Sequence, residues 1–206
     1  MKLIHPESIP DWLIKEVQEY FVPLPFEPQS ILDIGANIGA FAQLALEHWP
    51  STRIICCEPM PFNVTRLRHA VGNRATILSA AIRAHSGIDE IYLGDNLVTG
   101  GFVQLGRQTQ HRIVVECLAA HELPSCELVK VDTEGCELEI LMNLKLDQTR
   151  AVWVEYIVWP MPRRSVDCWN EILNSKHRFR TMHLGQWHLC GFKGVFWLSV
   201  SSVNVG

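Results

Sequence analysis

The residues with the clearest chemical potential lie in one short stretch, Ser30 to Phe41. An apolar run ends in Asp33 and Gly35, and Gly39 follows where an amphipathic run begins. This order is typical of a strand, a tight glycine turn and a helix, and open α/β sheets bind ligands at the carboxyl ends of their strands. Glycines in such a turn let ligand atoms approach the backbone, and the unpaired N–H groups of the helix start can hold a carboxylate.

The spacing of the glycines decides between classes of ligand. A dinucleotide fingerprint needs G-x-G-x-x-G, whose middle glycine admits the pyrophosphate, but Asn37 takes that position here and Ala40 takes the last. A phosphate-binding P-loop is excluded as well, because neither G-K-S nor G-K-T follows. The pattern that remains is D-x-G-x-x-x-G. The residues of this turn that we expect to contact the ligand are Asp33, Gly35, Ala36, Asn37 and Gly39.

Glu58 is the candidate for binding a ribose. It ends the apolar strand predicted over 52–58, about 20 residues after the glycine turn, where an acid holds ribose in related folds. An ionised carboxylate can accept strong hydrogen bonds from both ribose hydroxyls. Pro59 and Asn63 follow Glu58 and open the next amphipathic helix, so we place them in the same half of the site.

The third predicted strand, 75–82, ends in small residues. Ala80 and Ala81 would let a flat adenine ring approach the sheet, and we include both among the cofactor-binding residues. The alternative is that these small side chains pack under a helix.

A second informative stretch runs from Cys126 to Glu137. Its strand ends at Asp132, where the sheet opens towards ligand, and a helix follows. Glu134 lies near the start of this helix, where the alternative to a functional role is stabilisation by the helix dipole. Lys130 faces the same side of the strand as Asp132, and a lysine in a buried strand needs an anionic partner.

The composition bounds the class of protein. With 206 residues, 48% of them hydrophobic, the chain is most simply one domain over 1–206 with a sizeable core. The formal net charge is −4 and the basic residues are dispersed, so there is no electrostatic footprint for nucleic acid. No apolar run approaches the roughly 20 residues of a membrane span, and the amino terminus lacks the apolar region of a signal peptide.

The cysteines indicate a compartment. Their number is seven, no C-x-x-C occurs, and several lie inside apolar strands. Buried free thiols in a reducing cytosol explain this pattern better than disulfides or a zinc site do, so we expect a cytoplasmic protein.

The other elements follow from periodicity and from proline and glycine. Residues 1–28 form an extension with a helix over 11–21, which is either packed on the sheet edge or a cap over the ligand site. The remaining prediction is strands over 88–93, 111–117, 151–157, 179–183 and 195–200, a helical turn over 118–123, a helix over 165–175 and a long loop over 94–110.

Three segments together resemble the FkbM family of methyltransferases that use S-adenosylmethionine (SAM). The first is 31–39, whose D-x-G-x-x-x-G is similar to the first motif of all class I SAM methyltransferases, and the second is 57–59 with Asn63. The third, 129–139, is close to the family's own signature K-I/V-D-x-E-G-x-E. Cys136 replaces the usual alanine and Thr133 an aliphatic residue, and neither change threatens cofactor binding.

The resemblance implies an α/β fold of three layers, with a doubly wound, mostly parallel seven-stranded sheet and one antiparallel strand near the carboxyl end. It implies SAM bound over 33–39 with Glu58 on the ribose. It also implies O-methylation of a hydroxyl on a sugar, glycan, polyketide or similar small metabolite, and it leaves the catalytic residues open.

Methyl transfer from a sulfonium to a hydroxyl is an in-line displacement in which positioning supplies most of the acceleration. A general base would add roughly 10²–10⁴-fold, and Asp132 is the first candidate, Glu134 the second, with His183 or His188 behind them. A divalent metal could hold the hydroxyl instead. The strand over 151–157 ends without an acidic pair, so no metal site is predicted.

The acceptor class follows from surface features. The glycine-rich polar loop over 94–110 is suited to closing over a compact polar substrate, and Trp159, Trp169 and Trp187 offer flat faces for a sugar ring. Two other classes of protein remain open. One is a nucleotide-dependent oxidoreductase, which the missing middle glycine disfavours, and the other is a non-catalytic SAM-binding module.

Overall fold

The computed structural model of the protein describes residues 9–18, 20–21, 23–93, 100–101, 111–158, 179–184 and 192–200, and side chains as far as residue 155 except in 94–110. Predictions that fall elsewhere lie outside the described residues. They concern most of the loop over 94–110, the helix over 165–175, the side chain of His183, and the residues His188, Trp159, Trp169 and Trp187.

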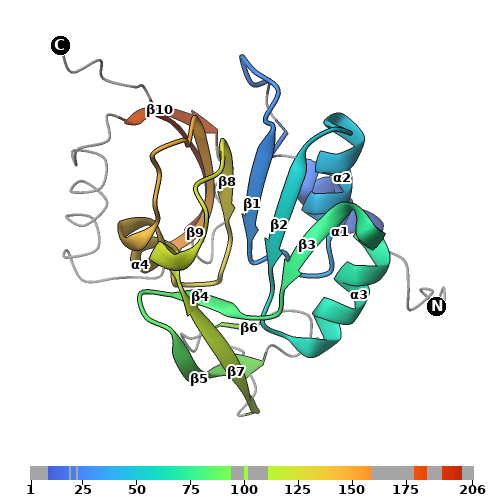
Figure 1. The fold of residues 1–206 in the computed structure, drawn as a ribbon, viewed down its shortest axis with the longest axis vertical. Coiled ribbons are helices and arrows are strands. Elements are labelled where there is room, and N and C mark those ends of the chain that lie inside the picture. Colours follow the sequence, from blue (N-terminus) through green and yellow to red (C-terminus); the bar gives the residue numbers. More distant parts are fainter. Residues whose placement is uncertain are drawn as a thin grey trace.

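A seven-stranded sheet forms the centre of the molecule (Figure 1). Its strands, in spatial order, are β3 (Ala75–Leu78), β2 (Arg53–Cys57), β1 (Ser30–Ile34), β8 (Leu128–Val131), β9 (Ala151–Val158), β11 (Phe192–Val200) and β10 (Phe179–Leu184). The first five strands pair in parallel, and β11 runs antiparallel to both of its neighbours. The expected doubly wound sheet with one antiparallel strand near the carboxyl end is thereby confirmed.

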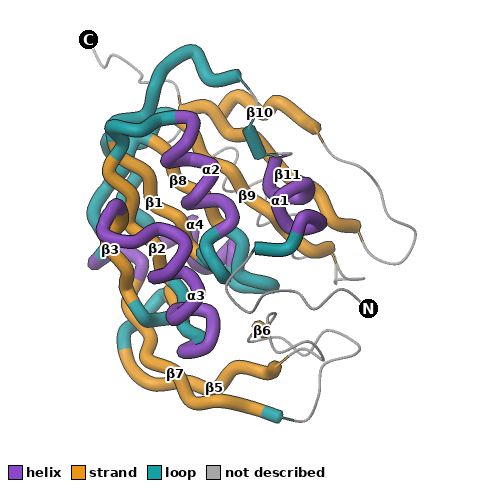
Figure 2. Tube along the Cα trace, turned by 90° about the vertical axis from the view of Figure 1, so that its right-hand side faces the viewer, coloured by secondary structure: helices purple, strands orange, loops and turns teal. Residues whose placement is uncertain are grey.

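Helices cover both faces of this sheet. They are α1 (Asp11–Gln18), α2 (Ala40–His48), α3 (Pro61–Val71) and α4 (Glu137–Asn143), with short 3₁₀ turns η1 (Gly72–Arg74) and η2 (Ala120–Glu122). The first three helices pack on the face that bears Ile31, Ile54 and Trp153, and α4 packs on the opposite face with Leu32, Val129 and Val152. Figures 1 and 2 show these two layers on either side of the strands. No helix in the part of the chain that the structure describes is long and apolar enough to cross a membrane.

A second, smaller sheet lies beyond the end of β3 (Figure 1). Its strand order is β4 (Ala81–Arg83), β7 (Arg112–Ala119), β5 (Gly87–Leu93) and β6 (Gly100–Gly101). The predicted strand over 75–82 was wrong in extent, because β3 ends at Leu78 and Ala81 pairs with Cys117 in this second sheet. Ala81 is buried there in a cluster with Met60 and Val115. A continuous apolar run in the sequence does not reveal that its two halves join different sheets.

The amino-terminal helix is shorter than expected and packs on α2. It ends at Gln18, and Tyr20 then lies in a turn closed by its own N–H on the Val17 carbonyl, 3.0 Å away. Leu13 and Val17 join the same buried cluster as Phe41. This contact places the end of the segment over the main sheet rather than at its edge.

Two glycines of the turn after β1 are required by the protein's own packing. A Cβ on Gly35, whose φ is +77°, would lie 1.7 Å from the backbone oxygen of Asp132. A Cβ on Gly39, at φ +94°, would lie 2.9 Å from Leu67 Cδ1 on α3. The sequence suggested close approach of a ligand as the reason for these glycines, which stays a prediction, and the structure adds the close approach of the residue after β8 and of α3.

Gly35→Ala should therefore destabilise the fold strongly, because the added methyl group meets fixed backbone as well as an unfavourable φ. The matched control is Gly72→Ala, since Gly72 has φ +57° but open space around its Cβ position. Gly72 lies at φ +57° and ψ −132°, a sparsely populated region, so the control should lose only the backbone term, about 1–3 kcal/mol, and Gly35→Ala clearly more. Chemical denaturation measures both variants, and equal losses would contradict the packing argument.

Candidate active site

The glycine turn is fastened to the end of β2. The backbone N–H groups of Gly35 and Ala36 both donate to the Cys57 carbonyl, at 3.0 Å each. Asn37 has a positive φ of 52°, and its Oδ1 accepts from the Ile38 N–H at 2.7 Å. The polypeptide is thus held in a fixed curve between β1 and α2, directly beside the residue that follows Cys57.

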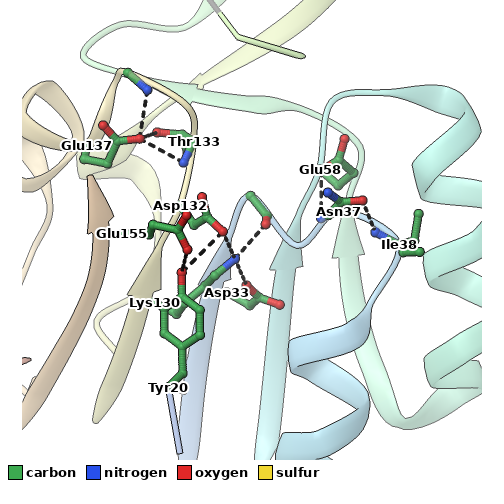
Figure 3. A network of polar contacts seen from close by, with 12 residues as sticks. Tyr20, Asp33, Asn37, Ile38, Glu58, Lys130, Asp132, Thr133, Glu137 and Glu155 are labelled. Carbon is green, nitrogen blue, oxygen red and sulfur yellow. Dashed lines mark hydrogen bonds and ion pairs between the residues drawn. The ribbon is translucent and has the colours of Figure 1, made fainter. Parts of the chain in front are cut away.

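That residue is Glu58, and it binds the turn directly (Figure 3). Its Oε2 accepts from the Asn37 N–H at 2.9 Å, and its Oε1 accepts from the Met60 N–H at 2.9 Å and from Asn63 Nδ2 at 3.3 Å. These contacts use three of the roughly four acceptor positions of a carboxylate. Glu58 therefore has capacity for one further donor while it keeps its protein contacts.

Burial governs the ionisation of Glu58. The residue is only 5% exposed, and this burial raises the pKa of its carboxyl group to about 7, against the opposing effect of the Met60 and Asn37 amides and Asn63. Near neutral pH the group is close to its midpoint, so its charge responds to any donor that approaches it.

The other cofactor residues predicted from sequence lie around this centre. Asn63 is buried at the start of α3, Pro59 is half-buried before it, and Ala80 and Ala81 are buried at the passage from the main to the small sheet. Ala81 shares a cluster with Met60, whose N–H binds Glu58. The structure thus brings the glycine turn, Glu58 and Asn63 into direct contact. Ala81 does not join this contact but packs in the same cluster as Met60, which does.

A buried polar network lies on the α1–α2 face of the main sheet (Figure 3). Strand register brings its members together, because Asp33 pairs with Lys130, and Lys130 with Trp153, on neighbouring parallel strands. Figure 3 shows Asp33, Lys130 and Asp132 side by side. Lys130 Nζ lies 3.2 Å from Asp33 Oδ1, 3.5 Å from Asp132 Oδ2 and 2.7 Å from the Gly35 carbonyl oxygen. One ammonium thereby joins β1, the glycine turn and the end of β8.

The charges in this network depend on one another. Burial alone would lower the pKa of Lys130, but the charges of Asp33 and Asp132 outweigh it and raise that pKa above its ordinary value. Burial raises the pKa of Asp33, with Lys130 opposing the shift. Asp33 is completely buried, and its Oδ2 has no hydrogen-bond donor among the described residues. The carboxylate therefore has spare acceptor capacity next to the glycine turn.

Tyr20 and Glu155 complete the network, and sequence reasoning assigned neither of them to the site. The Tyr20 hydroxyl contacts Glu155 Oε2 and lies 3.4 Å from Asp132 Oδ2. Two signals were available: an acid inside the apolar strand over 151–157, and a tyrosine on the apolar side of the first helix. Only strand register and the fold of the amino-terminal segment bring them to Asp132.

The two acids at the start of α4 have separate surroundings. Glu137 is buried, and its Oε1 accepts from Thr133 N and Oγ1 at 3.0 Å and from Gly135 N at 2.9 Å, so it holds the loop after β8 in shape. Glu134 is half-buried in that loop, with a positive φ of 55°. Of the two residues predicted to be catalytic, Asp132 joins the buried network, and a catalytic role for Glu134 stays a prediction. Among the described residues, no group of His, Cys, Asp and Glu side chains could hold a metal ion.

The strand order, the glycine turn and the acid after β2 are those of the class I methyltransferase fold, which the solved structures described below share. The particular family is shown by the sequence: the Methyltransferase FkbM domain matches residues 33–180, and the chain belongs to this family. The resemblance seen in the sequence is confirmed.

Solved structures agree with the fold. The methyltransferase FkbM from Methylobacillus flagellatus is 14% identical, with a TM-score of 0.55 over 90% of this chain and 50% of that one. An O-methyltransferase from Bacillus cereus in complex with SAH is 10% identical, with a TM-score of 0.54 over 95% and 83% of the two chains. The chain thus spans half the length of the FkbM structure. No curated protein matches the sequence.

Lys130→Met should cost about 3–5 kcal/mol of folding stability, because it leaves two carboxylates without their buried counter-ion. The control is Arg112→Met, which breaks the exposed pair with Glu90 at 3.2 Å and should cost about 1 kcal/mol or less. Adding Asp33→Asn to Lys130→Met removes one of the two unpaired carboxylates and should restore part of the lost folding stability. Denaturant titration at pH 7 measures all three variants, and equal losses in the two single variants would refute this role for Lys130.

Proposed function

We propose that the protein is a SAM-dependent O-methyltransferase that acts on a hydroxyl of a sugar, glycan, polyketide or similar small metabolite. The observation that carries the proposal is the hydrogen bond from the Asn37 N–H to Glu58 Oε2. It makes the glycine turn and the acid after β2 one rigid unit at the carboxyl ends of two neighbouring strands. Membership of the FkbM family supports methyl transfer, and the relative in complex with SAH supports the cofactor.

The described residues fit SAM by the chemistry of their free acceptor and donor groups. The remaining acceptor position of Glu58 suits a ribose hydroxyl, and a second hydroxyl would have to displace a protein contact, of which the one to Asn63 is the longest. The spare oxygen of Asp33 suits an ammonium group, although Asp33 is buried and a donor would have to reach it beside Gly35. The N-terminus of α2 has no side-chain cap, so its N–H groups suit a carboxylate.

When bound, SAM supplies a methyl group on a sulfonium that leaves as a neutral thioether. The protein must align the acceptor oxygen with that methyl group and take up the proton that the hydroxyl loses. Asp132 suits the second task, because its side chain is 28% exposed while its partner Lys130 is 4% exposed. Lys130 keeps Asp132 oriented at the end of β8, and Glu134 is the second candidate for the base.

The acceptor class and the compartment are also proposals. The net charge of −4 gives little attraction for phosphate backbones, so we propose a small or glycan-like acceptor and not a nucleic acid. The cysteines Cys56, Cys57, Cys117, Cys126 and Cys136 are free and buried, in keeping with a cytoplasmic protein.

Binding of S-adenosylhomocysteine should depend on the charge of Glu58. The ionised carboxylate is the stronger acceptor, so affinity should fall as pH drops below about 7, the pKa of the free protein's Glu58. Glu58→Gln should lower affinity at pH 8 by about 1.5–3 kcal/mol, the value of a charge-assisted hydrogen bond, and should flatten this pH dependence. The control is Glu47→Gln, which removes the same charge from the exposed end of α2. Calorimetry from about pH 5.5 to about pH 8.5, a range that brackets the pKa of Glu58, tests this prediction. Equal affinity in wild type and Glu58→Gln would overturn the ribose assignment.

Label from methyl-labelled SAM should appear in hydroxyl-bearing metabolites or glycans. The wild-type protein is incubated with extracted glycans, small metabolites, total RNA and total protein in separate reactions. Mass spectrometry of the purified protein shows in parallel whether SAM or S-adenosylhomocysteine is retained. Label only in RNA or protein would exclude the proposed acceptor class. Retained cofactor without transfer to any of the four extracts would favour a non-catalytic SAM-binding module.

A further inference from the structure

We propose that Tyr20 relays a proton between Asp132 and Glu155, so that the three side chains act as one proton-accepting group. The inference rests on the proposed methyl transfer for its chemistry, while its geometry depends only on the protein. The Tyr20 hydroxyl contacts Glu155 Oε2 and lies 3.4 Å from Asp132 Oδ2 (Figure 3). Tyr20 is a positioning and relay residue here, because Asp132 stands between it and the acceptor.

The number of hydrogens in this cluster is the central argument. Each hydrogen bond between two oxygens needs a hydrogen between them, the phenol of Tyr20 has one, and an ionised carboxylate has none to donate. With Asp132 and Glu155 both ionised, the phenol can satisfy only one of its two contacts. One additional proton on either carboxyl group lets both contacts become hydrogen bonds, the one to Asp132 by shortening from 3.4 Å to the usual O–H···O range of about 2.5–3.0 Å. The cluster is therefore built to hold that proton at either end.

The surrounding charges favour uptake of the additional proton. Among the side chains that the structure describes, the charged groups that face Tyr20 are Glu16 on α1, Asp33 on β1, Lys130 on β8, Asp132 directly after β8, and Glu155 on β9. Within this set several carboxylates lie close to one another, and like charges at short range favour the protonated form of one of them. Burial, together with the nearby carboxylates, raises the pKa of Tyr20 well above its ordinary value, so the phenol keeps its own hydrogen.

Accessibility gives the relay a direction. Tyr20 is 1% exposed and Glu155 is 5% exposed, while the side chain of Asp132 is 28% exposed, so Asp132 is the open end. As the acceptor oxygen bonds to the methyl carbon and the carbon–sulfur bond breaks, the hydroxyl proton passes to Asp132. Asp132 then donates a proton to the Tyr20 oxygen, and the Tyr20 hydrogen passes to Glu155. The reverse sequence returns the proton to Asp132 and from there to solvent.

The packing of Tyr20 allows a clean test. The centroid of its ring lies 6.0 Å from that of Phe41 and 6.3 Å from that of Trp153. Because Tyr20→Phe keeps this ring packing, it removes only the hydroxyl. The matched control is Tyr92→Phe, the same change on β5 of the small sheet, where the ring lies against Arg112.

The first measurement needs no acceptor. Nuclear magnetic resonance of ¹³C-labelled carboxyl groups follows the titration of Glu155, assigned with Glu155→Gln. Asp132→Asn should displace the Glu155 midpoint by roughly one pH unit or more, as expected for strongly coupled groups. In the Tyr20→Phe background that displacement should fall by at least half. The same displacement in both backgrounds would overturn the relay, since coupling through space alone survives the loss of the hydroxyl.

The second measurement separates the relay from the proposed function. Tyr20→Phe should reduce transfer of label from SAM into the metabolite and glycan extract by roughly tenfold or more, with S-adenosylhomocysteine affinity unchanged within about twofold. Tyr92→Phe should change neither quantity. If wild type binds no S-adenosylhomocysteine, the proposed function fails, and the resonance titration still decides the proton sharing. Full transfer by Tyr20→Phe, or a parallel loss of cofactor affinity, would show that Tyr20 is only structural.

Discussion

The arrangement of the site depends on the buried ammonium of Lys130. Its three acceptors come from near the end of β1, from the glycine turn that follows it and from the end of β8, so one charge joins the β1 turn to a strand about a hundred residues later in the sequence. Burying an ammonium is costly unless it is paired, and the pairing here keeps Asp33 and Asp132 in place as much as it keeps Lys130. Because Lys130 is almost completely buried, solvent cannot replace any of these partners.

Gly35 joins the two halves of the site. Its N–H binds the end of β2, its carbonyl oxygen binds Lys130, and its Cα lies against the backbone oxygen of Asp132. The cofactor half around Glu58 and the half around Asp132 therefore meet at one residue that has no room for a side chain. A shift of the end of β8 would therefore displace the glycine turn, because the two are in contact through backbone atoms, which cannot rotate away as a side chain can.

The amino-terminal segment is part of this structure. The sequence left open whether residues 1–28 pack on the sheet edge or cover the site. The described part of this segment packs on a helix and also contributes one side chain to the polar network. The helix α1 packs on α2, and Tyr20 after it reaches the end of β8 and the middle of β9. The aromatic rings of Phe41 and Trp153 hold the Tyr20 ring, so the polar contacts of its hydroxyl rest on apolar packing.

The sequence by itself determined the glycine turn, which follows from local periodicity, and the family, which follows from motifs of adjacent residues. The seven-stranded sheet with its one antiparallel strand was expected only through the resemblance that those motifs carry. It also required an anionic partner for Lys130, since a buried ammonium needs one wherever it lies. Only the tertiary structure decided that the strand over 75–82 divides between two sheets, that Gly35 and Gly39 make room for protein, and that Tyr20 and Glu155 meet Asp132. These contacts join residues that are distant in the sequence or belong to different elements, and the strand register and helix packing that set them leave no local pattern in the chain.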